Sequence, residues 1–176
     1  TWYGKNSYWY QYTTVVGSTT VDTHTIEADR PIDIKFIGYD EGSIAVEAGT
    51  ADVVVAGTLR NDTGTTSIAT TGTIRTVASA DSSASGTVGG RVVQLSAGGP
   101  IGTELNPLRI DLSNTRSNTR LDVETTSGSI NAVEVEGELR VGQIVAGGGG
   151  DVALAADGSV RRATAGSGIE GGAISM

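Results

Sequence analysis

The sequence predicts an all-β protein built as a parallel β-helix, a solenoid in which the chain winds round and stacks like sides on one another. Three observations predict this class. Glycine is abundant, at 26 of 176 residues, while proline occurs only 3 times. A glycine–polar–aliphatic triplet recurs along the chain, and aliphatic residues alternate with polar ones in short runs, as in half-buried strands. An antiparallel β-sandwich or barrel is the alternative architecture.

The triplet recurs at nearly constant spacing. "GSI", "GTL", "GTI" and "GTV" begin at Gly42, Gly57, Gly72 and Gly86, so the intervals between them are almost equal. The triplet returns at Gly128, Gly137 and Gly158. A fixed period without a helical pattern indicates stacked repeats, and two steps per winding predict about 30 residues per coil, with some coils nearer 20. Two-residue hairpin signals between matched strands are few, which favours winding over an antiparallel meander.

Each triplet predicts a turn followed by a strand. Glycine is expected to take the left-handed or bulged conformation of the turn, and the aliphatic residue two positions later is expected to point inward. Within the strands the expected inward positions are Ile32, Ile34 and Phe36 (or the following Ile37); Val93 and Leu95; Leu108, Ile110 and Leu112; and Val133 and Val135. The stretches 76–90 and 96–109 are expected to be loops, so the solenoid over residues 26–176 is predicted to be irregular around 77–118.

The first twelve residues hold six of the eight aromatic side chains. A solenoid is open at both ends and needs a cap, and large rings with polar edges suit that role. Residues 1–25 are therefore predicted to form an N-terminal cap or a junction with a neighbouring module. The alternative is that outward rings stack on sugars, and this glycan-binding hypothesis rests on Trp2, Tyr8, Trp9, Tyr10 and Tyr12.

The repeats resemble those of large exported bacterial adhesins, the filamentous-haemagglutinin-like and leukotoxin-like proteins. The resemblance rests on "IEADRPIDIKFIGYDEGSIAVEAG", "VVVAGTLRNDTGTTSIATTGTIRT" and "LDVETTSGSINAVEVEGELRVGQIVAGGGGDVALAADGSV", and it covers roughly residues 26–160. It implies a right-handed β-helix, secretion to the bacterial cell surface and a role in attachment. The implied partners are glycans or proteins of host or neighbouring cells and neighbouring modules of the same long chain.

Charge and composition exclude several other classes. The net charge of −8 disfavours nucleic acid as a partner, because phosphate backbones are repelled. The chain has no cysteine, which excludes disulfides and thiolate metal sites. No apolar run reaches the length of a membrane span, and no signal peptide is visible. We therefore expect a piece of a longer polypeptide or a mature form.

Acidic residues at turns give a calcium hypothesis. Asp40 and Glu41, Asp62, and Asp151 after a run of four glycines offer the oxygen ligands that Ca²⁺ prefers. The last site resembles a calcium β-roll repeat, with its aspartate one residue early and no second copy. Asx residues cap turns more often than they bind metal, so the chain is expected to need no cofactor, with Ca²⁺ as the candidate ion.

The alternative function is a carbohydrate-active β-helix enzyme. Such an enzyme needs carboxylates beside basic residues on one face. The candidates lie in "LRIDLSNTRSNTRLDVE" and are Arg109, Asp111, Arg116, Arg120 and Asp122. The alternative, purely structural interpretation is that these residues occupy solvated outward positions that alternate with inward aliphatic residues. The lone His24 has no partner in the sequence for a triad or a zinc site, so we predict a structural or binding segment of an adhesin without catalysis.

Overall fold

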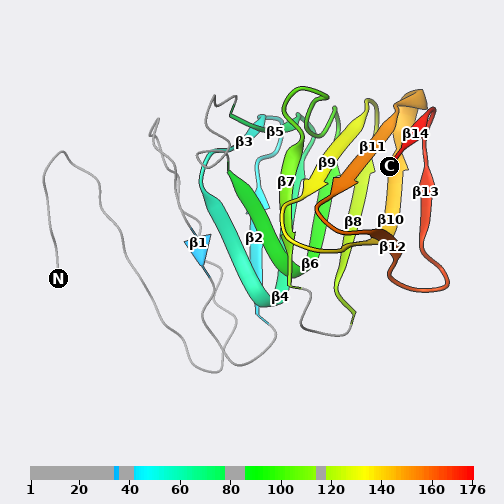
Figure 1. Ribbon diagram of the computed structural model, residues 1–176. Helices are drawn as coiled ribbons and strands as arrows, with labels where there is room; N and C mark the ends of the chain where they lie inside the picture. The colour runs from blue at the N-terminus through cyan, green and yellow to red at the C-terminus, as the bar shows by residue number, and fades with distance from the viewer. Residues whose placement is uncertain (1–33, 36–41, 78–85, 114–117) are drawn as a thin grey trace, which may run out of the picture.

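The protein is all-β, with a large parallel sheet that curls into a half-barrel (Figure 1). The computed structural model describes residues 34–35, 42–77, 86–113 and 118–176. In Figure 1 the strands follow one another across the molecule from cyan to red, so their order in space broadly follows their order in the chain. The expected all-β class is confirmed.

The described strands are short, apart from two long ones that bend around the curl. Their bounds are β1 (Ile34–Lys35), β2 (Ser43–Glu47), β3 (Val53–Val55), β4 (Thr58–Thr70), β5 (Ile74–Thr76), β6 (Thr87–Ala97), β7 (Leu108–Leu112), β8 (Arg120–Thr125), β9 (Ile130–Glu134), β10 (Leu139–Ala146), β11 (Val152–Ala156), β12 (Val160–Arg162), β13 (Gly168–Glu170) and β14 (Ile174–Ser175). A single 3-10 turn, Gly147–Gly149, precedes β11.

Every strand pairing in the described ranges is parallel. This holds for β2 with β4 and for β3 with β5, the region in which hairpins would have shown antiparallel neighbours. The antiparallel sandwich or barrel is therefore wrong for this part of the chain. Strands β4 and β6 each pair along both of their halves, and the β3–β5 pair continues through a bridge at Ile101 to β9.

The parallel register stacks inward side chains in three rows, which we name rows A, B and C. Row A contains Leu59, Val88, Ile110, Glu134 and Ala156. Row B contains Val46, Ile68, Leu95, Val123, Ile144 and Ile169. Row C contains Val53, Ile74, Ile101, Ile130, Val152 and Ile174. Most of these side chains are buried and form one continuous core inside the curl.

The returns of the chain to the same side differ in length. The Thr73 N–H donates to Asp52, 21 residues earlier, and the Asp151 N–H donates to Ser129, 22 residues earlier. Other returns are longer: Thr87 pairs with Thr58, 29 residues earlier, and Ile130 pairs with Ile101, also 29 residues earlier. The longer returns approach the expected length of about 30 residues per coil, and the shorter ones match the expectation that some coils are nearer 20.

The spacing of the triplets has a different meaning from the one predicted. The triplets at Gly42, Gly57 and Gly72 precede strands that carry rows B, A and C in turn. Along the chain the rows follow one another in the order A, B, C, so each triplet step covers two of the three sides. Two triplet steps therefore cover more than one passage of the chain through the three rows.

The triplet predicts strand starts correctly. Strands β2, β4, β5, β6, β9, β10 and β12 each begin one or two residues after a triplet glycine. The expected positive φ occurs only at Gly128 and Gly137 among these glycines. At Gly72 and Gly158 the reason is close approach instead, because a Cβ there would lie 2.8 Å from the Ala51 oxygen or 2.7 Å from the Gly137 oxygen.

The described residues of the stretch 77–118, which are 77, 86–113 and 118, are more regular than predicted. Residues 87–97 form β6 and residues 108–112 form β7, and both belong to the main sheet. The alternation expected for them is confirmed, since Val93, Leu95, Leu108, Ile110 and Leu112 are all buried. Between them the chain leaves the sheet only around 102–107, where Thr103 and Asn106 exchange backbone hydrogen bonds.

The predicted phase of β9 is wrong by one residue. Ala132 and Glu134 point into the core, whereas Val133 and Val135 are only half-buried. The triplet at Gly128 sets this phase: Ile130 is completely buried, and alternate residues after it share its side. The sequence predicted the opposite phase because Val133 and Val135 are the more hydrophobic residues of the strand. A carboxyl therefore takes a place in row A.

Deleting a side chain in row C is expected to destabilise the protein according to burial. Ile101 is completely buried, so Ile101→Ala should lower the free energy of unfolding by about 2–5 kcal/mol. Ile174 lies in the same row but is 46% exposed, and Ile174→Ala should cost clearly less. Urea denaturation followed by circular dichroism measures both, and equal losses would contradict the stacked-row description.

A triplet glycine that is needed for close approach should not tolerate alanine. A Cβ at Gly86 would lie 2.8 Å from the Ala56 nitrogen and closer still to the Val55 carbonyl, so Gly86→Ala should cost about 1–3 kcal/mol. Gly166 has open space around its Cβ position, and Gly166→Ala is the matched control with little expected cost. If thermal unfolding showed the two variants to be equally stable, the close-approach explanation would fail.

Candidate functional site

An open groove of about 620 Å³ crosses the outer surface of β4, β6, β8 and β10, and we name it the outer groove. Its neutral polar lining consists of Ser67, Gln94, Ser96 and Gln143. Its charged lining consists of Arg120, Asp122 and Glu124. A smaller hollow of about 260 Å³ adjoins it, since both are lined by Arg120, Asp122 and Gln143.

The register explains why these polar side chains meet. Gln94 lies between the buried Val93 and Leu95, and Asp122 lies between the buried Leu121 and Val123, so both point outward. Ser67, Gln94 and Asp122 are in register on three neighbouring strands. Ser96, Glu124 and Val145 form the next outward row, in which the Ser96 hydroxyl donates to Glu124 at 2.9 Å.

The Asp122 carboxylate is engaged by the protein itself. Its Oδ2 accepts a 2.8 Å hydrogen bond from the Arg120 Nε, and its Oδ1 accepts a 3.0 Å hydrogen bond from the Gln143 backbone N–H. The register of β10 against β8 shifts between Val141 and Ile144, which leaves that N–H without its regular backbone partner. Asp122 therefore closes a bulge, and Gly142 leaves room for it because a side chain there would meet the carboxylate.

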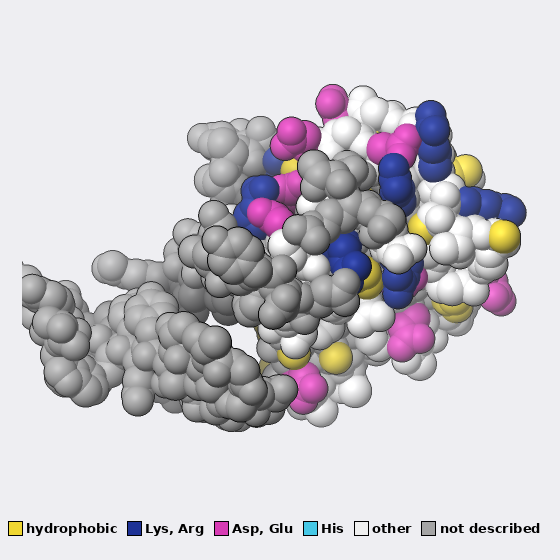
Figure 2. Space-filling model, turned by 90° about the horizontal axis from the view of Figure 1, so that it is seen from below, with side chains coloured by type: hydrophobic (Ala, Val, Ile, Leu, Met, Phe, Trp, Pro, Cys, Tyr) yellow, Lys and Arg dark blue, Asp and Glu magenta, His cyan; other side chains and the backbone are white. Residues whose placement is uncertain are grey.

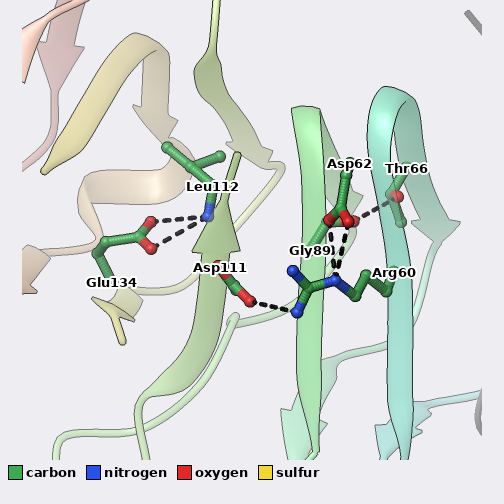
Figure 3. Close-up of polar contacts among 7 residues, drawn as sticks. All are labelled: Arg60, Asp62, Thr66, Gly89, Asp111, Leu112 and Glu134. Atoms are coloured by element: carbon green, nitrogen blue, oxygen red, sulfur yellow. Dashed lines mark hydrogen bonds and ion pairs between the residues drawn. The ribbon is translucent and has the colours of Figure 1, made fainter. Parts of the chain in front are cut away.

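A second polar cluster lies on β4 and β7. The Arg60 guanidinium contacts Asp62 on its own strand at 2.9 Å and Asp111 on β7 at 3.3 Å (Figure 3). Gly89 lies in register between Arg60 and Asp111. Because glycine has no side chain, the Arg60 guanidinium can reach across it to the Asp111 carboxylate. Burial raises the pKa of Asp111, against the opposing charge of Arg60.

Glu134 belongs to row A and is only 1% exposed. Its two carboxyl oxygens lie 3.0 and 3.2 Å from the Leu112 nitrogen, whose N–H donates to them (Figure 3). Strand β9 ends at Glu134, so Leu112 has no regular backbone acceptor on that side. Burial raises the pKa of Glu134 to about 8, opposed by backbone hydrogen bonds from Leu112 and Glu136. The carboxyl is therefore largely protonated at neutral pH, and it serves as the hydrogen-bond acceptor for the Leu112 N–H inside the core.

Basic and acidic side chains alternate along the outside of β8, β10 and β12. The Nε of Arg120 pairs with Asp122, while Arg140 and Arg161, in register with each other, both pair with Glu138. Figure 2 shows several Lys or Arg side chains on the face seen from below, with Asp or Glu side chains among and around them. Each of these three arginines therefore has a carboxylate partner, but Arg140 and Arg161 share the single carboxylate of Glu138.

The structure brings together only part of the predicted enzyme constellation. Arg120 and Asp122 share the outer groove, whereas Arg109 and Asp111 lie on β7 and are not in its lining. Arg116 lies outside the described residues. The sequence analysis did not predict Gln94, Gln143 or Glu134 as site residues. The available signal was the alternation of inward and outward positions, judged from the buried aliphatic residues in the same strands.

The calcium candidates that can be placed are engaged in other contacts. Asp62 pairs with Arg60, and the Asp151 Oδ1 accepts a 2.8 Å hydrogen bond from the Ala173 N–H. Asp40 and Glu41 lie outside the described residues, as do the aromatic candidates Trp2, Tyr8, Trp9, Tyr10 and Tyr12, and also His24. Within the described ranges no group of three or more His, Asp or Glu side chains is arranged to hold a metal ion.

Comparison of the chain with protein-family models, curated proteins and solved structures found no match. In the part of the chain that the structure describes, no helix is long and apolar enough to cross a membrane.

Replacing the buried carboxyl should change how stability depends on pH. The pKa of Glu134 is higher in the folded protein, at about 8, than its ordinary value of 4.5, so folding takes up a proton between these values. The stability from the protonated form is complete below about pH 4.5 and is lost as pH rises towards 8 and beyond. This loss is of the order of 3–5 kcal/mol. Glu134→Gln keeps an acceptor for Leu112 and should remove this part of the slope.

The test measures urea unfolding of the wild type and Glu134→Gln between pH 4.5 and 9. The variant should be more stable than the wild type at pH 9, with the difference shrinking towards pH 4.5. Glu104→Gln, in the exposed loop 102–107, is the control and should keep the wild-type slope. A Glu134→Gln variant with an unchanged slope would show that the carboxyl is not buried as described.

Proposed function

We propose that the chain is a right-handed parallel β-helix that serves as a rigid, non-catalytic attachment segment of a secreted bacterial cell-surface adhesin. The observation that carries the proposal is the stacking of three inward rows through successive parallel returns of the chain. Repeats that contact only their neighbours form long, stiff elements whose outer sides are open for binding. Such a segment suits a stalk or an attachment surface.

The closed winding of the chain and its right-handed sense are inferences that go further than the curled parallel sheet. Three rows that recur in the order A, B, C are what a three-sided solenoid requires. Connections between parallel strands of one sheet are right-handed in about 98% of cases, which supports the right-handed form. The resemblance of the triplets to adhesin repeats agrees with both inferences.

Binding is favoured over catalysis by the state of the carboxylates. Both oxygens of Asp122 accept hydrogen bonds from the protein, and Asp111 is paired with Arg60. Glu134 has a raised pKa, as a general acid would, but it is 1% exposed and points into the core. A general acid must reach the substrate, so these groups support a structural role more readily than glycoside cleavage.

The proposed partners are glycans or proteins on a host or neighbouring cell and the neighbouring modules of a longer chain. The acidic net charge makes nucleic acid an unfavourable partner. The proposal requires no cofactor, and Ca²⁺ remains a candidate only at the turns. The aromatic N-terminal segment is proposed as a cap or as a second glycan contact.

An adhesion assay tests the function. Beads coated with the full chain should attach to cultured animal cells or to intact bacteria, and excess soluble chain should reduce attachment at least tenfold. Ile110→Asp places a charge in row A, where the side chain is fully buried, and beads carrying this unfolded control should not attach.

Two results would overturn the proposal. One is attachment of the coated beads no greater than that of albumin-coated beads on every cell type. The other is release of reducing sugar ends from polysaccharides by the wild-type chain that is lost in Asp111→Asn or Asp122→Asn, which would establish the enzyme alternative.

A further inference from the structure

We infer that the outer groove is a binding site for a neutral, hydroxyl-rich glycan chain laid across β4, β6, β8 and β10. This inference rests on the proposed attachment function and names the surface and ligand class for it. The groove is the larger of the two hollows described above, and the smaller one extends it past Gln143. A concave surface with convergent polar groups is the usual form of a ligand site.

The hydrogen-bonding groups of the lining match those of sugar hydroxyls. A hydroxyl both donates and accepts, and the amides of Gln94 and Gln143 offer one acceptor and two donors each. The Gln94 side chain is exposed and makes no hydrogen bond with any described residue. Gln143 holds only a long 3.3 Å contact from its Nε2 to the Gly166 oxygen. Both amides are therefore available to a ligand.

The charge of the lining argues against ionic ligands. Arg120 is paired with Asp122, which leaves Glu124 as the excess charge of the groove, and the whole chain carries −8. Sulfated or uronate chains would be repelled, and the guanidinium that could attract them is already neutralised. A neutral chain does not incur this repulsion.

The position of the groove argues against an extended peptide. It lies on the outer face of the sheet, where the backbone N–H and C=O groups are used between neighbouring strands. A peptide cannot add a strand there, and it would need apolar anchor pockets instead. The lining has four apolar residues, Ile68, Leu95, Val123 and Val145. The first three are buried in the core, so Val145 is the one apolar side chain among the outward residues of the lining and no apolar anchor pocket is formed.

The stacking of the strands sets the size of the ligand. Four neighbouring strands span about 14 Å from the first to the last, because adjacent strands lie about 4.8 Å apart. The polar side chains project at this interval, so a linear oligosaccharide of several rings can contact each strand in turn. The groove is open, which suits binding within a long chain and not only at its end.

The test measures binding of the full chain to named probes by calorimetry. The neutral probes are hexasaccharides of β-glucan, mannan and galactan; the charged probes are heparin, polygalacturonate and poly-lysine. At least one neutral probe should bind, and Gln94→Ala with Gln143→Ala should weaken it by about tenfold or more through loss of two hydrogen-bonding amides. Asn131→Ala removes an amide from β9, outside the groove lining, and should leave affinity unchanged. Thermal unfolding should show that all the variants are folded.

Three results would overturn the inference: no neutral probe binds, only charged probes bind, or the groove variant binds neutral probes as tightly as the wild type. The bead assay separates this failure from failure of the adhesin proposal. Beads that attach equally well with and without the groove substitutions would leave attachment intact and remove the groove. Glycan binding that depends on the groove, without attachment of the beads to cells, would support the groove and overturn the adhesin proposal.

Discussion

Parallel backbone pairing between successive returns of the chain is the constraint on which the rest of the structure depends. Parallel strands lie about 4.8 Å apart and keep residues in register, so each side chain is stacked on one from the previous return. Row C shows the consequence, since aliphatic residues follow one another from Val53 to Ile174. One change of phase in any strand would move its inward side chains to the outer face.

The same constraint explains the polar side chains that accept from or donate to the backbone. Wherever the register shifts or a strand ends, a backbone N–H loses its partner, and a buried unpaired donor is costly. Asp122 accepts from Gln143 at the bulge of β10, and Glu134 accepts from Leu112 beyond the end of β9. Thr66 performs the complementary task by donating to the Gly89 oxygen beside the irregular stretch of β4 (Figure 3). These side chains stabilise the stacked strands by completing backbone hydrogen bonds.

The outer surface is assembled in the same way, from residues far apart in the sequence. Ser67, Gln94 and Asp122 come from three separate returns of the chain, yet they are neighbours on adjacent strands. A surface of this kind belongs to no single loop or motif. The proposed attachment role uses this arrangement, since the outer side carries polar side chains on adjacent strands at a fixed interval.

The sequence by itself determined the all-β class, the starts of the strands and most inward positions. These follow from local patterns, because glycine marks the turns and alternation marks the two faces of a strand. Only the tertiary structure decided which sides stack on which. The spacing of the triplets fits a coil that contains two triplets, and it fits equally a chain in which each triplet step passes two of three stacked rows. Local patterns do not distinguish these two arrangements. The groove and the buried Glu134 depend on that choice, since they form only when separate returns of the chain lie side by side.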